Sequence, residues 1–461
     1  MRRHRIGGIV VAVALLALTA CGGGGGTTST STPSNKPATL HVAYWSGFNP
    51  PGVNIMPSWI GAAATELQQT HPNVKVSLDE ITTNSESEYY AKLDLAERSS
   101  STAPDVAFED SFLIGSDASA GYIRPLPELT TWSGWPDYFP AMQKIVTYNG
   151  QVYGAMNSTD VQLVFYNKAL LQKAGIPVPW QPHSWNDVVH AADAIKRADS
   201  SVVPLWIYAG QENGEAASFR GFQVFLNGTN DRLYDEKTQK WEVSGPGFDA
   251  TWNYLESVRP YIEPESQWSS PMSDATVALN LIPAQNVGIV FDGSWVATAY
   301  VPGSLKPWPG FFTSYGWASL PTQSGQGGGY TNLSGGWALS VPQLAKHPDL
   351  STELIELASS PQNLAPFDAK TGNLPPRRAV LTEPAWIQAT KINPVFGYAT
   401  KQIPYTTFRP LQPAYVQVSN EIAKLTGDIA SGNKNANDAA REYESVVTGI
   451  VGAANVERMT S

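Results

Sequence analysis

The chain has 461 residues, more than the roughly 250–300 at which one hydrophobic core stops growing, so we expect at least two domains. Apolar residues make up 42% and charged residues 15%, which excludes a disordered or collagen-like chain. The net charge of −10 argues against nucleic-acid binding, and the single cysteine, Cys21, excludes an internal disulfide framework and a cysteine-based zinc site.

The N-terminal residues predict export and attachment to lipid. Three arginines precede an apolar stretch of 15 residues that ends at Ala20. This stretch is short for a membrane-spanning helix and suits a signal peptide. The sequence Leu-Thr-Ala-Cys ending at Cys21 resembles the bacterial lipobox, whose cysteine receives diacylglycerol. We therefore predict a signal peptide at 1–20 and a lipidated Cys21 with a flexible linker at 21–38, which place the protein on the outer face of the cell membrane without a membrane-spanning helix.

The rest of the chain contains two successive α/β patterns. In the first, strands are expected at 40–45, 74–78 and 105–108, with helices at 57–70 and 86–99. The pattern restarts near residue 150, with strands expected at 152–155, 162–166, 203–208, 287–291 and 337–341 and helices at 167–174, 185–198, 245–262, 272–284, 349–359, 414–430 and 437–451. In the first pattern, strands that alternate with helices indicate an α/β layer with a largely parallel sheet, and the restart of the pattern indicates a second α/β lobe.

Short motifs follow one another along nearly all of residues 40–450. They are LQQTHPNVKV at 67–76, APDV at 103–106, AGYIRPL at 120–126, NGQVYG at 149–154, YNK at 166–168, AGI at 174–176, SWND at 184–187, DGSW at 292–295, LP at 320–321, GG at 335–336 and TGNLP at 371–375. Together with the lipobox, this ordered set resembles the extracellular solute-binding proteins of ABC importers, in the sugar-binding, maltose-binding-protein-like family.

The resemblance implies a periplasmic-binding-protein-like α/β fold with two discontinuous lobes, a hinge and a ligand cleft between the lobes. We place the first lobe at 39–155 plus 300–370 and the second at 156–299 plus 371–461. It further implies a binding protein and not an enzyme, which captures a sugar or oligosaccharide by hinge closure and delivers it to the transmembrane subunits of an ABC permease. We expect a monomer that binds no nucleic acid, cofactor or metal and contacts the membrane only through its lipid.

A sugar site needs flat aromatic platforms together with carboxylates, amides and arginine as hydrogen-bond partners. Such groups are expected at strand ends, where the cleft of an α/β layer lies. The candidates at strand ends are Trp45, Glu109, Asp110, Gln211, Asp292 and Trp295. Glu109 and Asp110 could equally form a solvated loop pair.

Further candidates follow from the resemblance. Asp160 aligns with a cleft-facing carboxylate of the family, and the turn that contains Asp292 and Trp295 matches one whose aromatic ring stacks on sugar. Trp337 follows Gly336, where a missing side chain leaves room for a ligand. Arg377 either binds ligand with two hydrogen bonds or forms a surface ion pair, and Tyr415 lies in a stretch that faces the cleft in relatives.

Two other functions stay open. One is a solute-binding protein for a glycerophosphodiester. The other is a surface-anchored glycoside hydrolase, which needs two carboxylates about 5–9.5 Å apart, and Asp110, Asp160 and Asp292 could supply a pair. The sequence contains no phosphate-loop, dinucleotide-binding, zinc-protease or serine-hydrolase motif.

Overall fold

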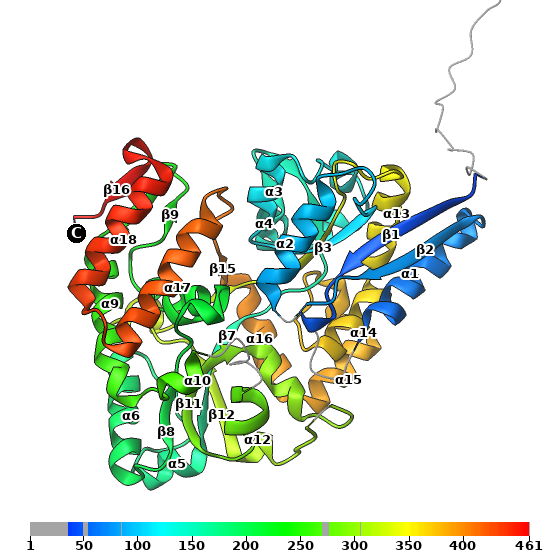
Figure 1. The fold of residues 1–461 in the computed structure, drawn as a ribbon. Helices are drawn as coiled ribbons and strands as arrows, with labels where there is room; N and C mark the ends of the chain where they lie inside the picture. Colours follow the sequence, from blue (N-terminus) through cyan, green and yellow to red (C-terminus); the bar gives the residue numbers. More distant parts are fainter. Residues whose placement is uncertain (1–35, 49–53, 84, 270–275, 305, 461) are drawn as a thin grey trace, which may run out of the picture.

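A computed structural model describes residues 36–48, 54–83, 85–269, 276–304 and 306–460. The predicted signal peptide, Cys21 and most of the predicted linker lie outside these residues. The described chain forms two α/β lobes, which lie side by side in Figure 1.

The first lobe is built on a five-stranded sheet in the order β2-β1-β3-β14-β6. The edge strand β2 (Val74–Glu80) and β3 (Val106–Asp110) each pair in parallel with β1 (Ala38–Tyr44), whereas β14 (Trp337–Ser340) is antiparallel to β3 and to β6 (Gly154–Met156). The strands predicted in this lobe are confirmed, with ends that differ by a few residues. The sheet is mixed and not purely parallel, because β14 is antiparallel to both of its neighbours. The chain enters β14 from the other lobe.

Helices cover both faces of this sheet. Helix α1 (Met56–Thr70) connects β1 to β2 and contacts α13 (Pro348–Ala358) and α14 (Pro361–Thr371). Helix α2 (Glu86–Glu97) begins after Ser85, whose hydroxyl accepts a hydrogen bond from the Glu88 backbone N–H. The helices predicted at 57–70, 86–99 and 349–359 are therefore confirmed.

The second lobe contains a four-stranded sheet in the order β12-β7-β11-β8. Its central strands are β7 (Gln162–Asn167) and β11 (Val287–Gly293), which are antiparallel and buried along their whole lengths. Strand β8 (Val203–Trp206) is parallel to β11, and β12 (Tyr315–Ser319) is antiparallel to β7. The chain enters this sheet from the first lobe at the start of β7, which pairs with the ends of β11 and β12, so residues at these ends can take part in a site between the lobes.

Local sequence explains the helices of the second lobe. Helix α6 (Trp185–Ala198) begins with a capping box, in which Ser184 and Asp187 each accept the other's backbone N–H. Helix α9 (Pro246–Val258) begins at a proline. The last two helices are α17 (Tyr415–Ser431) and α18 (Ala436–Val451), which confirm the helices predicted at 414–430 and 437–451. They pack against each other and against α9.

The chain passes between the lobes three times. It does so between β6 and β7, between β12 and β14, and between α16 (Pro394–Ala399) and α17. Two crossings are joined, because β13 (Leu333–Ser334) pairs with β15 (Thr407–Phe408).

Two features differ from the predicted lobe boundaries. Strand β12 pairs in the second sheet, although the prediction assigns residues 300–370 to the first lobe. Helix α15 (Pro384–Ile392) packs against α14 of the first lobe and α16 packs against α15, although the prediction assigns both helices to the second lobe. Pairing and core packing depend on contacts distant in sequence, which the order of elements does not reveal.

Candidate functional site

An arginine between the lobes lies at the centre of the candidate site. Arg409 is on the last crossing segment, between β15 and α17, and is 4% exposed. Its Nη2 is 2.7 Å from Oδ1 of Asp110, which ends β3 in the first lobe. Its Nη1 is 3.1 Å from Oε1 of Glu215, which begins the short helix α7 (Glu215–Ser218) in the second lobe. One cation thus joins carboxylates from both lobes.

Aromatic rings enclose this arginine. Its guanidinium carbon lies 4.7 Å from the centre of the Phe112 ring and 4.8 Å from that of Phe219. Burial raises the pKa of Asp110 and of Glu215, and the charge of Arg409 opposes that shift in both. Burial alone would lower the pKa of Arg409, but the charges of the two carboxylates outweigh it and raise that pKa, so the guanidinium stays charged.

Tyr415 supports the second carboxylate from α17. It is fully buried, and its hydroxyl donates to Oε1 of Glu215 and accepts from Nε2 of Gln223 at 2.8 Å. Its ring lies 5.6 Å from that of Phe112 in the first lobe. The predicted residue Tyr415 therefore belongs to the Arg409 group.

Asp160 lies on the first crossing segment, next to this group. Its Oδ1 accepts the backbone N–H of Gly335 at 3.1 Å and Nε2 of Gln162 at 2.9 Å. Burial raises its pKa to about 6, while these hydrogen bonds and the charge of Arg409 hold it lower than burial alone would. At Gly336, φ is +145°, and an added Cβ would lie 2.2 Å from the carbonyl oxygen of Ser158. The space at Gly336 that we assigned to a ligand is thus filled by the neighbouring crossing segment, which explains the glycine.

The first lobe adds a group of aromatic rings beside β3. Trp337 stacks on Phe108 with ring centres 4.6 Å apart and an interplanar angle of 8°. Trp45 lies 6.2 Å from Trp337 and 6.0 Å from Tyr89, and it remains partly exposed. The structure therefore brings the predicted residues Trp45 and Trp337 together, with Trp45 as the more accessible ring.

The second lobe contains a separate group at the end of β11. Asp292 is 2% exposed, and its carboxylate is 2.7 Å from Nη1 of Arg220 and 2.8 Å from the hydroxyl of Tyr208. The guanidinium carbon of Arg220 lies 5.3 Å from the centre of the partly exposed Trp295 ring. Asp292 thus holds Arg220 in place, and Trp295 remains available as a platform.

Three predicted residues lie elsewhere. Arg377 is 5% exposed and is held within the first lobe by Asp137 at 3.1 Å and by the carbonyl of Ser359. This is the ion-pair alternative, although Arg377 is buried and only Asp137 is partly exposed. Gln211 is exposed on a short 3-10 helix. Glu109 is fully buried in β3, and its side chain accepts from the Ser340 hydroxyl, so it forms no solvated loop pair with Asp110.

The burial of Glu109 predicts a pH dependence of stability. Burial raises its pKa to about 8, and the nearby Glu97 and Asp117 carboxyls also have pKa values raised well above the usual range, mainly by burial. The folded state therefore holds a proton on Glu109 that the unfolded state releases near its ordinary pKa of about 4.5. The contribution of Glu109 to the free energy of unfolding is therefore largest below about pH 4.5, and it is lost as the pH rises towards 8.

Urea unfolding between pH 5 and pH 8.5 measures this dependence. We expect Glu109→Gln to flatten the fall in unfolding free energy with pH, whereas Glu88→Gln on the exposed face of α2 leaves the slope unchanged. Equal slopes for Glu109→Gln and the wild-type protein would contradict the assignment.

Sequence reasoning missed Arg409, Glu215 and Arg220. Arg409 and Asp110 are 299 residues apart, and Arg409 and Glu215 are 194 apart. The available signal was local: Arg409 is a charged residue next to Pro410, in the short segment that leads to the amphipathic helix α17.

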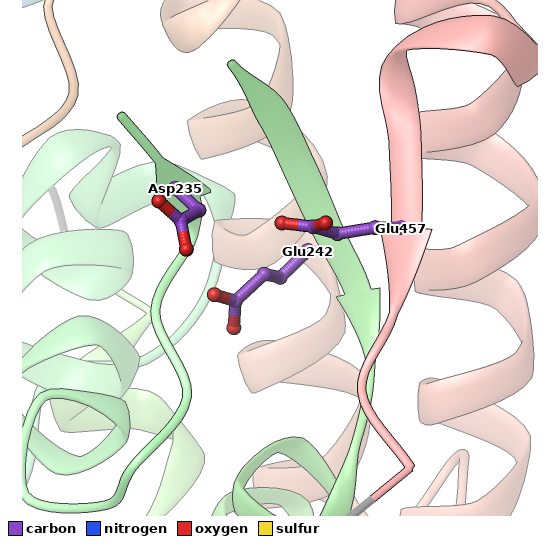
Figure 2. A group of neighbouring side chains, drawn as sticks. All are labelled: Asp235, Glu242 and Glu457. Carbon is purple, nitrogen blue, oxygen red and sulfur yellow. The ribbon is translucent and has the colours of Figure 1, made fainter. Parts of the chain in front are cut away.

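A cluster of carboxylates lies away from this site. Asp235, Glu242 and Glu457 come from the small sheet of β9 (Tyr234–Asp235), β10 (Lys240–Ser244) and β16 (Val456–Arg458), and Figure 2 shows their side chains. Each accepts a hydrogen bond from the protein, Glu242 from the Arg232 backbone N–H at 2.8 Å and Glu457 from the Thr238 hydroxyl at 2.7 Å. We assign the cluster no part in ligand binding.

Among the described helices, none is long and apolar enough to cross a bilayer.

Comparison with known proteins gives relatives along most of the chain. The family model described as "Bacterial extracellular solute-binding protein" matches residues 62–394. The maltodextrin-binding protein MdxE of Bacillus subtilis is 23% identical over 75% of this chain and 77% of its own length. A maltooligosaccharide ABC transporter solute-binding lipoprotein of Streptococcus pneumoniae is 24% identical over 76% of each chain.

Solved structures share the fold. The GacH receptor of Streptomyces glaucescens, solved unliganded and with acarbose, superposes with a TM-score of 0.72 at 21% identity, covering 91% of this chain and 99% of that one. A cyclic α-maltosyl-1,6-maltose binding protein of Arthrobacter globiformis has a TM-score of 0.69 at 19% identity, covering 90% and 99%. The predicted two-lobed α/β fold is therefore confirmed.

Proposed function

This chain belongs to the bacterial extracellular solute-binding protein family, and we propose that it captures a sugar or oligosaccharide between its lobes and delivers it to the permease of an ABC importer. The observation that carries the proposal is the meeting of Asp110 and Glu215, one from each lobe, at Arg409. Relatives named for maltodextrin and maltooligosaccharide binding support the choice of sugar.

The chemistry of the residues suits a neutral, polyhydroxylated ligand. The partly exposed rings of Trp45 and Trp295 offer flat apolar faces for the C–H surfaces of sugar rings. Asp110 and Asp160 offer acceptors, and Arg409 and Arg220 offer donors, so that hydroxyls can both donate and accept. A ligand that contacts both lobes favours the conformation in which the lobes are close, and the three crossing segments are the natural hinge.

The two alternatives fit these contacts less well. A phosphodiester calls for an uncompensated cation, whereas Arg409 and Arg220 are each paired with buried carboxylates. A glycosidase requires one carboxyl to act as acid and another as nucleophile or base. Here Asp110 and Asp292 are each held by an arginine, so we propose binding without chemistry.

A ligand screen tests the proposal. Thermal unfolding is followed with glucose, maltose, maltotriose, mannitol and glycerophosphocholine, and calorimetry then measures the dissociation constant of each compound that stabilises the protein. We expect stabilisation by a sugar and no new reducing ends after long incubation. Stabilisation by glycerophosphocholine alone would overturn the sugar assignment, and released reducing ends would overturn the absence of catalysis.

We further propose that Cys21 is lipidated and anchors a monomer to the outer face of the membrane. The Leu-Thr-Ala-Cys sequence and the lipoprotein nature of the Streptococcus pneumoniae relative support this. We expect Cys21→Ser to move the protein from the membrane fraction to the soluble fraction. Each CH₂ group of an acyl chain buried in the bilayer contributes about 0.8 kcal/mol to membrane binding, and the variant has no acyl chain. Fractionation followed by immunoblotting measures the change, with Ser29→Ala in the linker as the control. A Cys21→Ser protein that stays in the membrane fraction would contradict the anchor.

A further inference from the structure

The two lobes contact Arg409 in a matched way, because each lobe supplies one aromatic ring and one carboxylate. The first lobe contributes Asp110, which ends β3, and Phe112 two residues later. The second lobe contributes Glu215, which begins α7, and Phe219, which directly follows that helix. The guanidinium carbon lies 4.7 Å from one ring centre and 4.8 Å from the other, within the range of cation–π attraction. The cation is therefore held equally from both lobes.

Contacts beyond the arginine join the same two surfaces. Phe112 and Leu113 follow a strand of the first lobe but pack into the hydrophobic core of the second. Gly115, in α3 (Ile114–Ala120), lies against the last crossing segment, since an added Cβ would be 2.6 Å from the carbonyl oxygen of Leu411. Each of these contacts joins protein groups to protein groups, so the arrangement does not need a ligand to complete it.

Each carboxylate is also anchored within its own lobe. Oδ1 of Asp110 accepts the backbone N–H of Phe112 at 3.3 Å, and Glu215 accepts hydrogen bonds from two hydroxyls of α17. Neither carboxylate can therefore follow Arg409 if the lobes move apart. Opening leaves the arginine with one carboxylate, and no other cation among the described residues pairs with the one left behind. A buried charge that loses its partner costs free energy, so these contacts oppose opening.

We propose that Arg409 is a latch that keeps the lobes together before a ligand arrives, so that a ligand enters only when the latch opens. The inference rests on the proposed function for the identity of the ligand, and it adds a control over ligand entry. A latch makes opening a separate step that precedes binding. The rate of opening then limits the rate of ligand association, and removal of either carboxylate raises it. An arginine that only lined an open cleft would have neither effect.

The distance between the lobes tests the latch without any ligand. Cys21 is the only cysteine in the chain, so Cys21→Ser in the mature protein leaves no native thiol to label. Ala91→Cys on α2 and Asn420→Cys on α17 then place one spin label on each lobe, at positions that are both exposed. Pulsed electron paramagnetic resonance measures the distance between the labels. We expect one narrow distance distribution in the unliganded protein, which maltotriose leaves in place.

Two variants cut the latch from opposite lobes. Glu215→Gln and Asp110→Asn each keep the size of the side chain and remove one of the two negative charges. In each unliganded variant, the distribution should shift to distances longer by about 5 Å or more, the scale of a one-turn displacement. Asp137→Asn is the control, because it removes the partner of the buried Arg377 within the first lobe and should leave the distribution unchanged. Thermal melting verifies that each variant is folded before it is labelled.

Stopped-flow tryptophan fluorescence gives a second readout. In the wild-type protein, the observed rate of association with maltotriose should level off as its concentration rises, because opening comes first. In Glu215→Gln the rate should continue to rise and should be about tenfold higher or more at the same concentration, since the open state is no longer a minor one.

The outcomes separate the latch from the proposed function. Long distances in the unliganded wild-type protein that shorten only with maltotriose would overturn the latch and leave sugar binding intact. Unchanged distributions in both Glu215→Gln and Asp110→Asn would also overturn it, because other contacts would then hold the lobes together. Failure of every sugar in the screen to bind would overturn the proposed function, and the unliganded distances would still decide the latch.

Discussion

Replacing Arg409 by methionine should lower the free energy of unfolding by about 3–5 kcal/mol, because removal of one partner leaves buried charges uncompensated. The arginine is 4% exposed and is the cation shared by Asp110 and Glu215. Among the residues that the structure describes, no other cation pairs with either carboxylate, so without Arg409 each must lose its charge or draw in water. Methionine retains the apolar contact with Phe112, so the change reports the charge more than the lost packing.

The sign of the pH dependence distinguishes this effect from lost packing. Arg409 holds the pKa of both carboxyls below the value that burial alone would give. Without the arginine, both pKa values rise further in the folded state, so protonation favours the folded variant. Arg409→Met should therefore be destabilised more at pH 8 than at pH 5.

Urea unfolding at these two pH values measures the effect. Arg197→Met removes the exposed pair between Arg197 and Asp193 and should cost about 0.5 kcal/mol or less. Adding Asp110→Asn and Glu215→Gln to Arg409→Met should recover part of the stability, since neutral amides do not require a cation. A loss below about 1 kcal/mol for Arg409→Met would mean that the carboxylates are hydrated, and the proposed closed arrangement around Arg409 would be wrong.

Replacing Trp295 by alanine should weaken ligand binding by about 2 kcal/mol or more, as is typical for an aromatic anchor, which corresponds to a loss of roughly 30-fold in affinity. The ring is partly exposed at the end of a fully buried strand, and Arg220 lies over it. A sugar ring stacked there would lose its platform, while the ion pair between Arg220 and Asp292 would remain.

Calorimetry with the sugar identified by the screen measures this loss. Trp295→Phe should retain much of the affinity because it keeps a flat ring. Trp180→Ala should leave the affinity unchanged, since Trp180 packs against Tyr166 outside the candidate site. Unchanged affinity in a folded Trp295→Ala protein would show that the ligand does not stack on this ring.

Neighbouring residues in one strand illustrate the limit of sequence reasoning. Glu109 and Asp110 are adjacent at the end of β3, and the sequence treats them as equivalent carboxylates. Side chains alternate between the faces of a strand, so one enters the core and the other meets Arg409. Which face holds the core depends on the helices packed against the sheet. Arg377 is similar, because its partner Asp137 is 240 residues away.

The sequence by itself determined the features that arise from neighbouring residues. Apolar spacing specifies α1, α6, α17 and α18, a capping side chain lies directly before α6 and α18, and short apolar runs specify the strands of both lobes. The order of these elements determined the α/β class, and Trp295 was found because it follows a buried strand.

Only the tertiary structure decided how the two lobes share one charged centre. Arg409, Asp110, Glu215 and Tyr415 meet because three crossing segments bring together elements far apart in the chain. A buried charge is stable only beside its partner, so the identity of that partner follows from the packing of the lobes and not from the local sequence.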